Sequence, residues 1–321
     1  MKAIVIPTFG GPDVLQLQDL PTPVPAAGEA LVRVAAAGVN YRDVYERMGR
    51  YGGTPPIVAG VEGAGTVEAL GEGTRDVHVG EHVAFTGIAG AYAEYVVAPA
   101  DRLIPLPDGF LMIQGAAFPL QGMTAHYLVH EYYDVTPQTS VLVHAAAGGL
   151  GLLLVQMLKA AGARVIGTTS SEEKAAIARA AGADDVILYA QTNWVEAVKK
   201  LTKGAGVDLV LDGVGKSTLP GSLDAVRTRG TVVLFGSSSG PADPIVPGIL
   251  QTRSLTLAGG TLPNFIATRE ELLRRAADVL SAIQGGTLEL RIDRSLPLAE
   301  AAEAHRLLES RTTSGKIVLV V

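Results

Sequence analysis

The sequence contains no cysteine among its 321 residues. Disulfides, thiolate zinc sites and cysteine nucleophiles are therefore excluded. A basic surplus is also missing, because 26 Lys and Arg residues stand against 32 Asp and Glu residues and give a net charge of −6. Binding to a phosphate backbone depends on a surplus of cations that displaces counterions, so we expect no nucleic-acid partner.

Long apolar runs are absent too. The longest run, residues 145–155, is much shorter than the roughly 20 residues that span a bilayer. The first apolar stretch has Lys2 as its only charge and is broken at Pro7 and Gly10, which makes it too short for a secretory signal. We therefore expect a soluble cytoplasmic protein with no membrane partner.

The residues that are present divide the chain into two parts with different patterns of predicted secondary structure. Hydrophobic residues make up 48% and glycine occurs 38 times, as is usual for α/β enzymes with many tight turns. In the first part, Val-rich runs alternate with Gly, Pro and Asp clusters and predict a barrel-like β domain, interrupted by one helix at 41–49. The predicted strands there are 30–39, 65–70, 82–86 and 91–97.

From about Gln114, short apolar runs alternate with helical patterns. The predicted strands are 140–144, 164–168, 185–188, 207–212 and 231–235, and the predicted helices are 149–161, 172–181 and 194–202. The central strands are apolar almost throughout, as expected when helices cover both faces of a sheet. This alternation predicts a parallel, doubly wound sheet.

The C-terminal segment predicts a return to helices and one last strand. A long helix is expected at 268–284, where Thr268 and Glu271 have capping-box spacing. A second helix is expected at 298–310 and a strand at 316–321. We expect this tail to rejoin the first domain and complete it.

The strongest local signal is the stretch HAAAGGLG at residues 144–151. It follows a predicted strand and opens a predicted helix, the context in which a glycine-rich loop binds a dinucleotide. Gly148 would let the backbone approach a pyrophosphate, Gly151 would let the helix pack closely on the strand, and the helix N-terminus offers free N–H groups. Ala146 replaces the first glycine of the usual G-x-G-x-x-G pattern, so an ordinary βα turn is the alternative. The surrounding βα units favour the dinucleotide site.

The end of the next strand indicates which dinucleotide binds. NAD sites usually carry Asp or Glu there to hold the ribose 2′-hydroxyl, but residues 167–171 read GTTSS. Ser170, Ser171 and Lys174 supply hydroxyls and a cation that suit a 2′-phosphate, so we expect NADPH rather than NADH. The structural alternatives are helix-capping serines and a lysine on a solvated helix face.

The order and spacing of several segments carry a family resemblance. The segments are AAGVNYRDVYERMGRY (36–51), GVEGAGTV (60–67), HAAAGGLG (144–151), GTTSSEEK (167–174), LFGSSSG (234–240) and LLESRTTSGKIVL (307–319). Together they resemble the quinone oxidoreductase (zeta-crystallin-like) branch of the medium-chain dehydrogenase/reductase superfamily, over nearly the whole chain. The resemblance implies an α/β fold with a GroES-like β-barrel catalytic domain at 1–122 and 260–321. The inserted residues 123–259 would form a doubly wound parallel Rossmann domain, with an NADPH cleft between the two.

The resemblance also implies which residues act on the substrate. Carried over position by position, it places Asn40 and Thr124 near the nicotinamide and Tyr51 in the substrate pocket, with Tyr45 close by. The candidate catalytic residues are therefore Asn40, Tyr51 and Thr124. Tyr51 is a candidate proton donor, and a pocket wall is its alternative role.

The remaining candidates would hold the cofactor. Ser170, Lys174 and Tyr189 match positions at the adenosine phosphate end, and Gly236 and Ser237 match a loop beside the cofactor. With the phosphate loop and Ser171, the full set is Ala147, Gly148, Gly149, Leu150, Gly151, Ser170, Ser171, Lys174, Tyr189, Gly236 and Ser237.

A metal site is not expected. Related alcohol dehydrogenases carry zinc-binding Cys and His where this chain has Asn40 and Val61, and without zinc the Lewis acid that polarises an alcohol is lost. His126 and His130 are four residues apart, but packing explains them better than a metal pair. 

The other titratable groups have simpler expected roles. Asp43 and Glu62 are expected to form buried polar support in the first domain. His144 is expected to donate to the backbone rather than to act in catalysis.

The reaction that the resemblance implies is hydride transfer from NADPH to a quinone or to an α,β-unsaturated carbonyl, without zinc. Two alternatives stay open: an enoyl-thioester reductase of the same fold, which VNYRDVYERMGRY also resembles, and a non-enzymatic, crystallin-like NADPH-binding protein. The resemblance and the apolar, strand-like residues 254–258 predict a homodimer, because an exposed sheet edge tends to be paired or covered.

Overall fold

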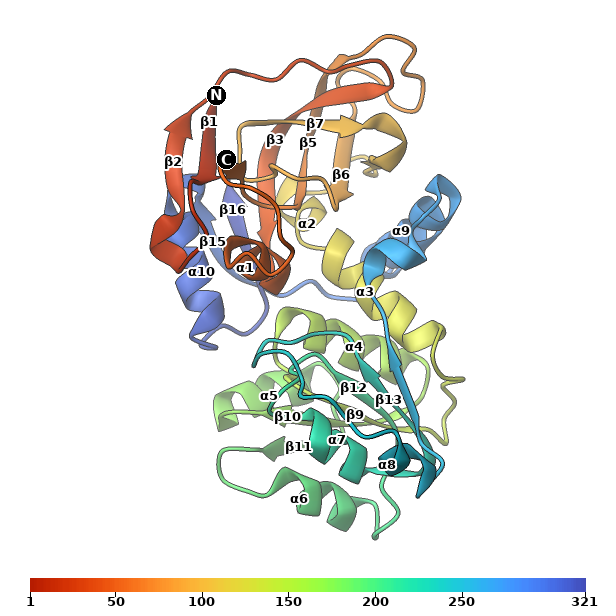
Figure 1. Ribbon diagram of the computed structural model, residues 1–321. Coiled ribbons are helices and arrows are strands. Elements are labelled where there is room, and N and C mark those ends of the chain that lie inside the picture. Colours follow the sequence, from red (N-terminus) through yellow and green to blue (C-terminus); the bar gives the residue numbers. More distant parts are fainter. The chain divides into compact units, whose positions relative to one another are not determined.

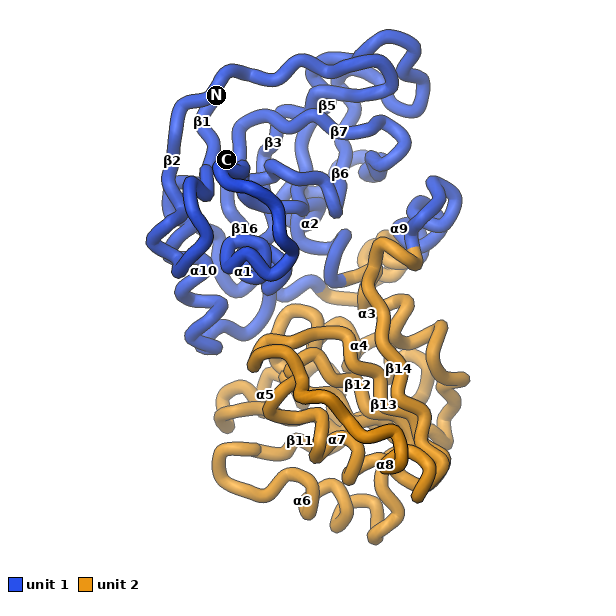
Figure 2. Tube along the Cα trace, viewed as in Figure 1, with its two compact units in different colours: residues 1–121, 266–278, 290–321 blue, residues 122–265, 279–289 orange.

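A computed structural model describes all residues from 1 to 321 as two compact units (Figures 1 and 2). Unit 1 contains Met1–Gln121, Ile266–Asp278 and Leu290–Val321, and unit 2 contains Gly122–Phe265 and Val279–Glu289. No helix in either unit combines the length and the apolar character that crossing a bilayer requires.

Unit 1 consists mainly of antiparallel strands. They are β1 (Lys2–Ile6), β2 (Gln16–Asp19), β3 (Glu29–Val39), β4 (Ile57–Val58), β5 (Glu62–Leu70), β6 (His82–Thr86), β7 (Tyr95–Pro99), β8 (Ile104–Pro105), β15 (Ile292–Pro297) and β16 (Lys316–Val320). The larger sheet has the order β15-β16-β3-β5-β6-β8, with β7 also paired to β3, and the smaller sheet has the order β2-β1-β4. The barrel-like β domain expected from the sequence is confirmed.

Short helices connect these strands. They are α1 (Tyr41–Arg47), α2 (Met112–Gly115), α10 (Ala301–Glu309), and the 3-10 turns η1 (Pro12–Val14), η2 (Ala100–Arg102) and η4 (Leu298–Glu300). Two longer helices, α3 (Pro119–His130) and α9 (Arg269–Gln284), each begin in unit 1 and end in unit 2. The N-terminus of α9 has the predicted capping box, since the backbone N–H of Thr268 donates to Glu271 and the N–H of Glu271 donates to Thr268.

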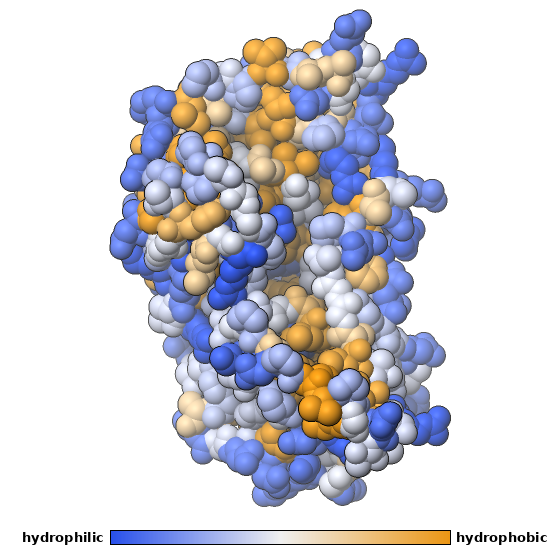
Figure 3. Space-filling view, viewed as in Figure 1, coloured by the Kyte–Doolittle hydropathy of each residue, from blue (hydrophilic) through white to orange (hydrophobic).

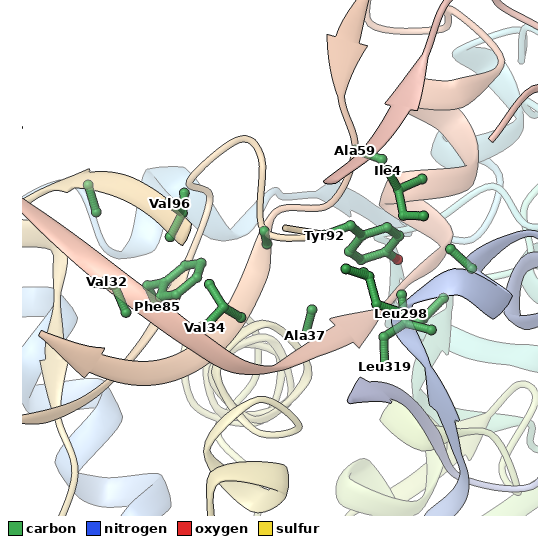
Figure 4. Close-up of a cluster of buried hydrophobic side chains, with 14 of the residues drawn as sticks. Ile4, Val32, Val34, Ala37, Ala59, Phe85, Tyr92, Val96, Leu298 and Leu319 are labelled. Atoms are coloured by element: carbon green, nitrogen blue, oxygen red, sulfur yellow. The ribbon is translucent and has the colours of Figure 1, made fainter. Parts of the chain in front are cut away.

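Most of the C-terminal tail belongs to unit 1, and residues Val279–Glu289 belong to unit 2. Strand β16 runs antiparallel to β3, with Ile317 opposite Val39, and β15 runs parallel to β16. The core draws on both ends of the chain, because Ile4 of β1 and Leu319 of β16 are buried in the same cluster as Phe85 of β6 (Figure 4). Burial of each such side chain contributes about 1.5–3 kcal/mol, so the tail is part of the stable unit.

Unit 2 is an α/β layer structure around a parallel sheet. Its strands are β9 (Ser140–Val143), β10 (Arg164–Thr169), β11 (Asp185–Leu188), β12 (Val207–Asp212), β13 (Val226–Leu234) and β14 (Thr256–Gly259). Its helices are α4 (Gly149–Ala160), α5 (Glu172–Ala180), α6 (Trp194–Leu201), α7 (Leu219–Ala225), α8 (Gly248–Gln251) and the 3-10 turn η3 (Leu262–Phe265). The central strands are buried along nearly their whole length, which requires cover on both faces.

The strand order of unit 2 identifies where a ligand would bind. The order is β11-β10-β9-β12-β13-β14, so the chain winds in one direction from β9 to β11 and in the other from β12 to β14. The doubly wound sheet predicted from the sequence is confirmed. In such sheets the loops diverge at the carboxyl ends of the strands where the direction reverses, here β9 and β12, and leave a crevice for a dinucleotide.

Candidate functional site

The loop from His144 to Gly151 leaves β9 and enters α4 at this reversal point. The first turn of α4 presents the backbone N–H groups of Gly149, Leu150 and Gly151, which have no acceptor within the helix. The helix has 12 residues, so these donors and its dipole form an anion-binding end. The loop therefore fits a pyrophosphate.

Two glycines of this loop meet different surroundings. A Cβ on Gly151 would lie 2.3 Å from the carbonyl oxygen of Ala145, so only glycine allows α4 to start this close to the strand. A Cβ on Gly148 would meet only the same oxygen, at 3.3 Å, and the backbone φ of Gly148 is −75°. That distance is shorter than an ordinary contact, so a side chain at Gly148 would require a small shift of the loop, much less than at Gly151. 

A buried network lies beneath this edge of the sheet. His144 Nδ1 is 3.0 Å from Thr168 Oγ1, and His144 Nε2 is 3.1 Å from Ser222 Oγ. Ser222 Oγ donates to Asp212 Oδ2 at 2.7 Å, and Asp212 Oδ1 accepts the backbone N–H of Gly215 at 3.0 Å. His144 therefore forms its hydrogen bonds with side chains, whereas the sequence analysis expected it to donate to the backbone.

The network fixes the tautomer of His144. Because Ser222 has one hydroxyl proton and gives it to Asp212, its oxygen must accept a proton from Nε2 of His144. Nδ1 then accepts the hydroxyl proton of Thr168. Burial lowers the pKa of His144, with Asp212 opposing, so the neutral ring is favoured. Both ring nitrogens are used in these bonds, which leaves His144 no proton to exchange with a substrate.

The carboxyl ends of β10 and β11 form the next part of the edge. Thr169 is paired in register with Leu188, so Ser170 and Tyr189 follow the two strands side by side. Ser171 caps α5 by accepting the N–H of Lys174 at 3.3 Å. Sequence reasoning gave this capping role as the structural alternative, and it leaves the Ser171 hydroxyl proton available to a ligand.

The loops after β12 and β13 close the other side of the edge. Phe235 N–H donates to the carbonyl of Asp212 at 3.0 Å, and Ser239 Oγ donates to the carbonyl of Val214 at 2.7 Å. These bonds hold Gly236 and Ser237 beside the end of β12. The structure thus brings all the predicted cofactor-binding residues to the carboxyl edge of one sheet.

Unit 1 contains a second polar centre, which we call the Glu62 cluster: Asn40, Glu62, Gln121 and Lys316. The register of β16, β3 and β5 places Lys316, Asn40 and Glu62 at one end of three adjacent strands, since Ile317 pairs with Val39 and Gly63 pairs with Ala37, and Gln121 comes from α3. Lys316 Nζ donates to Glu62 Oε2 at 2.6 Å and to Asn40 Oδ1 at 2.7 Å. The predicted burial of Glu62 is confirmed.

The hydrogen-bonding capacity of Asn40 is filled within this cluster. Its Nδ2 donates to Glu62 Oε2 at 2.7 Å and, at 3.4 Å, to the carbonyl of Gly38. Its Oδ1 accepts from Lys316 and, at 3.3 Å, from Gln121 Nε2. The bond to Gln121 is the longer of the two at Oδ1 and is the one that a ligand could replace at least cost.

A branch of buried groups extends from Asn40 along α1. Asp43 accepts the N–H of Asn40 at 2.7 Å and the hydroxyl of Tyr92 at 3.0 Å, which confirms its predicted burial. Burial raises the pKa of Asp43 to about 7, although these donors and Lys316 oppose the rise. Burial lowers the pKa of His305 to about 3, and the neighbouring Arg47 acts in the same direction.

Tyr51 lies at the end of an aromatic group that we call the Tyr45 cluster: Tyr41, Tyr45, Tyr51, Arg42 and Arg50. The ring centroids of Tyr41 and Tyr45 are 6.1 Å apart, and those of Tyr45 and Tyr51 are 6.3 Å apart. Burial of its hydroxyl raises the pKa of Tyr51, with Arg42 opposing, so the phenol stays protonated at neutral pH. Tyr51 can therefore donate a hydrogen bond.

The other candidates occupy simpler positions. Thr124 is buried on α3 within unit 2. It belongs to neither the Glu62 cluster nor the Tyr45 cluster of unit 1. The rings of His126 and His130 are 4.6 Å apart on the same helix. No group of three or more metal-ligating side chains occurs in the structure.

Lys316, Thr168 and Ser222 were missed by the sequence analysis. Lys316 is the third residue of SGKIVL, a segment used only for the resemblance and for the predicted strand at 316–321. Thr168 was noted only for its place in the GTTSS run. Ser222 carried no local signal, because it becomes a partner of His144 only through folding.

Comparison with known proteins assigns the family. Residues 26–108 match the alcohol dehydrogenase GroES-like domain, and residues 149–278 match the zinc-binding dehydrogenase family. A quinone oxidoreductase of Pseudomonas aeruginosa is 41% identical over 99% of both chains. A 2-haloacrylate reductase of a Burkholderia species is 39% identical over 100% of this chain and 99% of its own. The solved structure of Escherichia coli quinone oxidoreductase, complexed with NADPH, has a TM-score of 0.97 and 37% identity over 100% of both chains.

Proposed function

Because the chain belongs to the quinone oxidoreductase branch of the medium-chain dehydrogenase/reductase superfamily, we propose that it is an oxidoreductase that transfers hydride from NADPH to a quinone or an α,β-unsaturated carbonyl. The observation that carries the cofactor assignment is the end of β10. It offers the hydroxyls of Ser170 and Ser171 and no carboxylate, and the nearby Glu172 is held by Arg179 at 2.5 Å. The relative solved with NADPH supports the same assignment.

The residues of unit 2 would bind and orient the cofactor. The N–H groups at the start of α4, together with Ala147 and Gly148, would hold the pyrophosphate. Ser170, Ser171, Lys174 and Tyr189 would surround the 2′-phosphate end, and Gly236 and Ser237 would line the adjoining wall. When bound, NADPH supplies the hydride, and the protein supplies alignment and the exclusion of water.

The roles predicted for Asn40, Tyr51 and Thr124 are kept as proposals. The protonated hydroxyl of Tyr51 would donate to the substrate oxygen that gains negative charge. Asn40 would keep its orientation through Lys316 and Glu62, and it would reach a ligand by giving up its bond to Gln121. A proton from solvent completes the reduction, so no side chain has to act as an obligatory acid.

The test is NADPH oxidation, followed by loss of NADPH absorbance, with a panel of quinones, enones and enoyl thioesters. We expect turnover with quinones or enones and much weaker turnover with the thioesters. Gly148→Val is the control for dependence on the cofactor site, because its branched side chain would occupy the space of the pyrophosphate and should lower turnover with every acceptor. Preference for a thioester would favour the enoyl-thioester alternative, and no turnover with any acceptor would favour the crystallin-like alternative.

We also propose that the enzyme works without zinc. The support is the absence of cysteine and the engagement of Asn40 with Glu62 and Lys316. Elemental analysis should find far less than one zinc per chain. One zinc per chain, with activity lost to a chelator, would contradict the proposal.

We further propose a homodimer assembled through the β14 edge of unit 2. Strand β14 pairs with β13 on one side only, and Val246 and Ile249, on the segment that precedes β14, are exposed. Figure 3 shows apolar residues gathered on unit 2 near α8. Light scattering at micromolar concentration should give a dimer mass, and a monomer mass would refute this proposal. 

Three other expectations remain predictions from the sequence. They are the domain division at 1–122 and 260–321 against 123–259, the cytoplasmic location, and the lack of a nucleic-acid partner.

A further inference from the structure

The Tyr45 cluster contains two cations that lie on aromatic rings. The guanidinium carbon of Arg42 is 5.0 Å from the centroid of the Tyr51 ring, and that of Arg50 is 4.7 Å from the centroid of the Tyr45 ring. Tyr51, which the proposed function assigns to the substrate, and Tyr45, which the resemblance places close by, therefore each have a guanidinium beside the ring. A guanidinium over an aromatic ring keeps its positive charge, so it can attract an anion that approaches the same ring.

Neither of these guanidiniums is neutralised by an ion pair. Arg47, on the same helix, shows the contrasting case, because it is buried and binds Glu309 with both nitrogens at 2.9 Å. Arg42 and Arg50 have no such carboxylate partner. Glu46 lies one helical turn after Arg42, and burial raises the pKa of Glu46, with Arg42 opposing.

Arg42 also carries an unsatisfied donor. Its Nε is shielded from solvent and has no hydrogen-bond partner. A buried donor without an acceptor costs about 1–3 kcal/mol, so an arriving acceptor would be stabilised at this position. Asp43, the neighbouring acid, does not fill this role: its Oδ2 accepts from Asn40 and Tyr92, and its buried Oδ1 makes no hydrogen bond.

We propose that Arg42, assisted by Arg50, selects conjugated substrates that carry an anionic substituent, such as a carboxylate or sulfonate, next to the reducible bond. The anion would accept from Arg42 while the ring or carbonyl of the substrate lies against Tyr51 and Tyr45. This inference rests on the proposed function, since it assigns a substrate class to the same site. Arg42 and Arg50 would be specificity-determining residues.

The experiment compares 1,4-naphthoquinone with 1,4-naphthoquinone-2-sulfonate in the NADPH-oxidation assay on the full-length protein. The measured quantity is the ratio of kcat/KM for the sulfonate to kcat/KM for the neutral quinone, so differences in cofactor binding cancel. Arg42→Gln should lower this ratio about tenfold, the effect of one charge-assisted hydrogen bond, mainly through KM for the sulfonate. Arg50→Gln should lower it less, and Glu46→Gln should raise it.

Arg33→Gln is the matched control, because it removes one surface charge on β3 that pairs with Glu68 outside the Tyr45 cluster. Its ratio should equal that of the wild type. Added salt should reduce the preference of the wild type for the sulfonate and have little effect in Arg42→Gln. Circular dichroism checks that each variant is folded. If Arg42→Gln does not fold, the ratio measured with Arg50→Gln still tests the proposal.

The outcomes separate this inference from the proposed function. A ratio that stays the same in Arg42→Gln and Arg50→Gln, while neutral quinone is still reduced, refutes the anion site and leaves the function intact. A fall of equal size in Arg33→Gln would show an effect of net charge and would also refute it. No turnover by the wild type with either quinone or with any enone of the panel refutes the proposed function itself.

Discussion

Replacement of Lys316 by methionine tests the Glu62 cluster most directly. Lys316 is 3% exposed and Glu62 is 0% exposed, so the ion pair between them is completely desolvated. Methionine keeps most of the apolar stem but removes the charge. Glu62 would then retain only the N–H of Leu120 at 2.6 Å and the amide of Asn40 at 2.7 Å.

The expected cost follows from the uncompensated charge. Breaking a buried ion pair by removal of one partner costs about 3–5 kcal/mol, which is a large share of a typical stability of about 5–15 kcal/mol. Glu62→Gln in the Lys316→Met background should recover part of this loss, because it removes the stranded carboxylate. The double variant should therefore be more stable than Lys316→Met alone.

Urea unfolding followed by two probes measures the effect. Trp194 is the only tryptophan and lies in unit 2, so its fluorescence follows that unit, whereas far-UV circular dichroism follows both. Lys316→Met should move the dichroism transition to lower urea more than the fluorescence transition. A loss below about 1 kcal/mol, or a double variant less stable than Lys316→Met, would refute the claim that Lys316 neutralises Glu62.

The other predictions concern the cofactor, the buried acid and the active-site division of labour. NADPH should bind at least about tenfold tighter than NADH, roughly 1.4 kcal/mol, and Lys174→Ala should erode this preference in a titration; equal affinities in the wild type would contradict it. Burial raises the pKa of Asp43 to about 7, so its stabilising contribution is full below about pH 4 and is lost as the pH rises to 7. The Tm of Asp43→Asn, measured against that of the wild type, should therefore improve across this window, and a steady or opposite trend would argue against a buried carboxyl. Tyr51→Phe should lower kcat by about tenfold to a hundredfold, because solvent can supply the proton, while Gly148→Val should do worse by displacing the pyrophosphate. A loss above about ten-thousandfold in Tyr51→Phe, with unchanged NADPH affinity, would make Tyr51 an essential acid.

The fold could be predicted wherever the local pattern was strong. Strands β6, β11 and β12 have the predicted bounds, because apolar runs flanked by turn residues define them. Strands β2 and β15 were not predicted, since QLQD is mostly polar and half of IDRSLP is polar, and both strands gain their place by pairing with β1 and β16. Helix α7 was missed because LPGSLDA is short and contains Pro and Gly, which lower helix propensity.

The site could be predicted where it is made by one segment. The phosphate loop is continuous in sequence, so its glycines and the following helix were sufficient to predict the dinucleotide site. The Glu62 cluster joins Asn40 to a glutamate 22 residues away and Glu62 to a lysine 254 residues away. A lysine at the start of an apolar strand usually lies in solvent. Only the register of β16 against β3 places Lys316 in the interior of unit 1. No local pattern contains that information.

The His144 network shows how the distant contacts serve the local motif. Asp212 accepts the N–H of Gly215 at 3.0 Å and so shapes the loop after β12. Through Ser222 it fixes His144 at the start of the phosphate loop, and His144 in turn holds Thr168 near the end of β10. The loops after these strands are thereby set before any cofactor arrives, which lowers the ordering cost of binding. The glycine pattern predicts where a pyrophosphate can approach, whereas the buried Asp-Ser-His-Thr chain determines how rigidly the loops hold it.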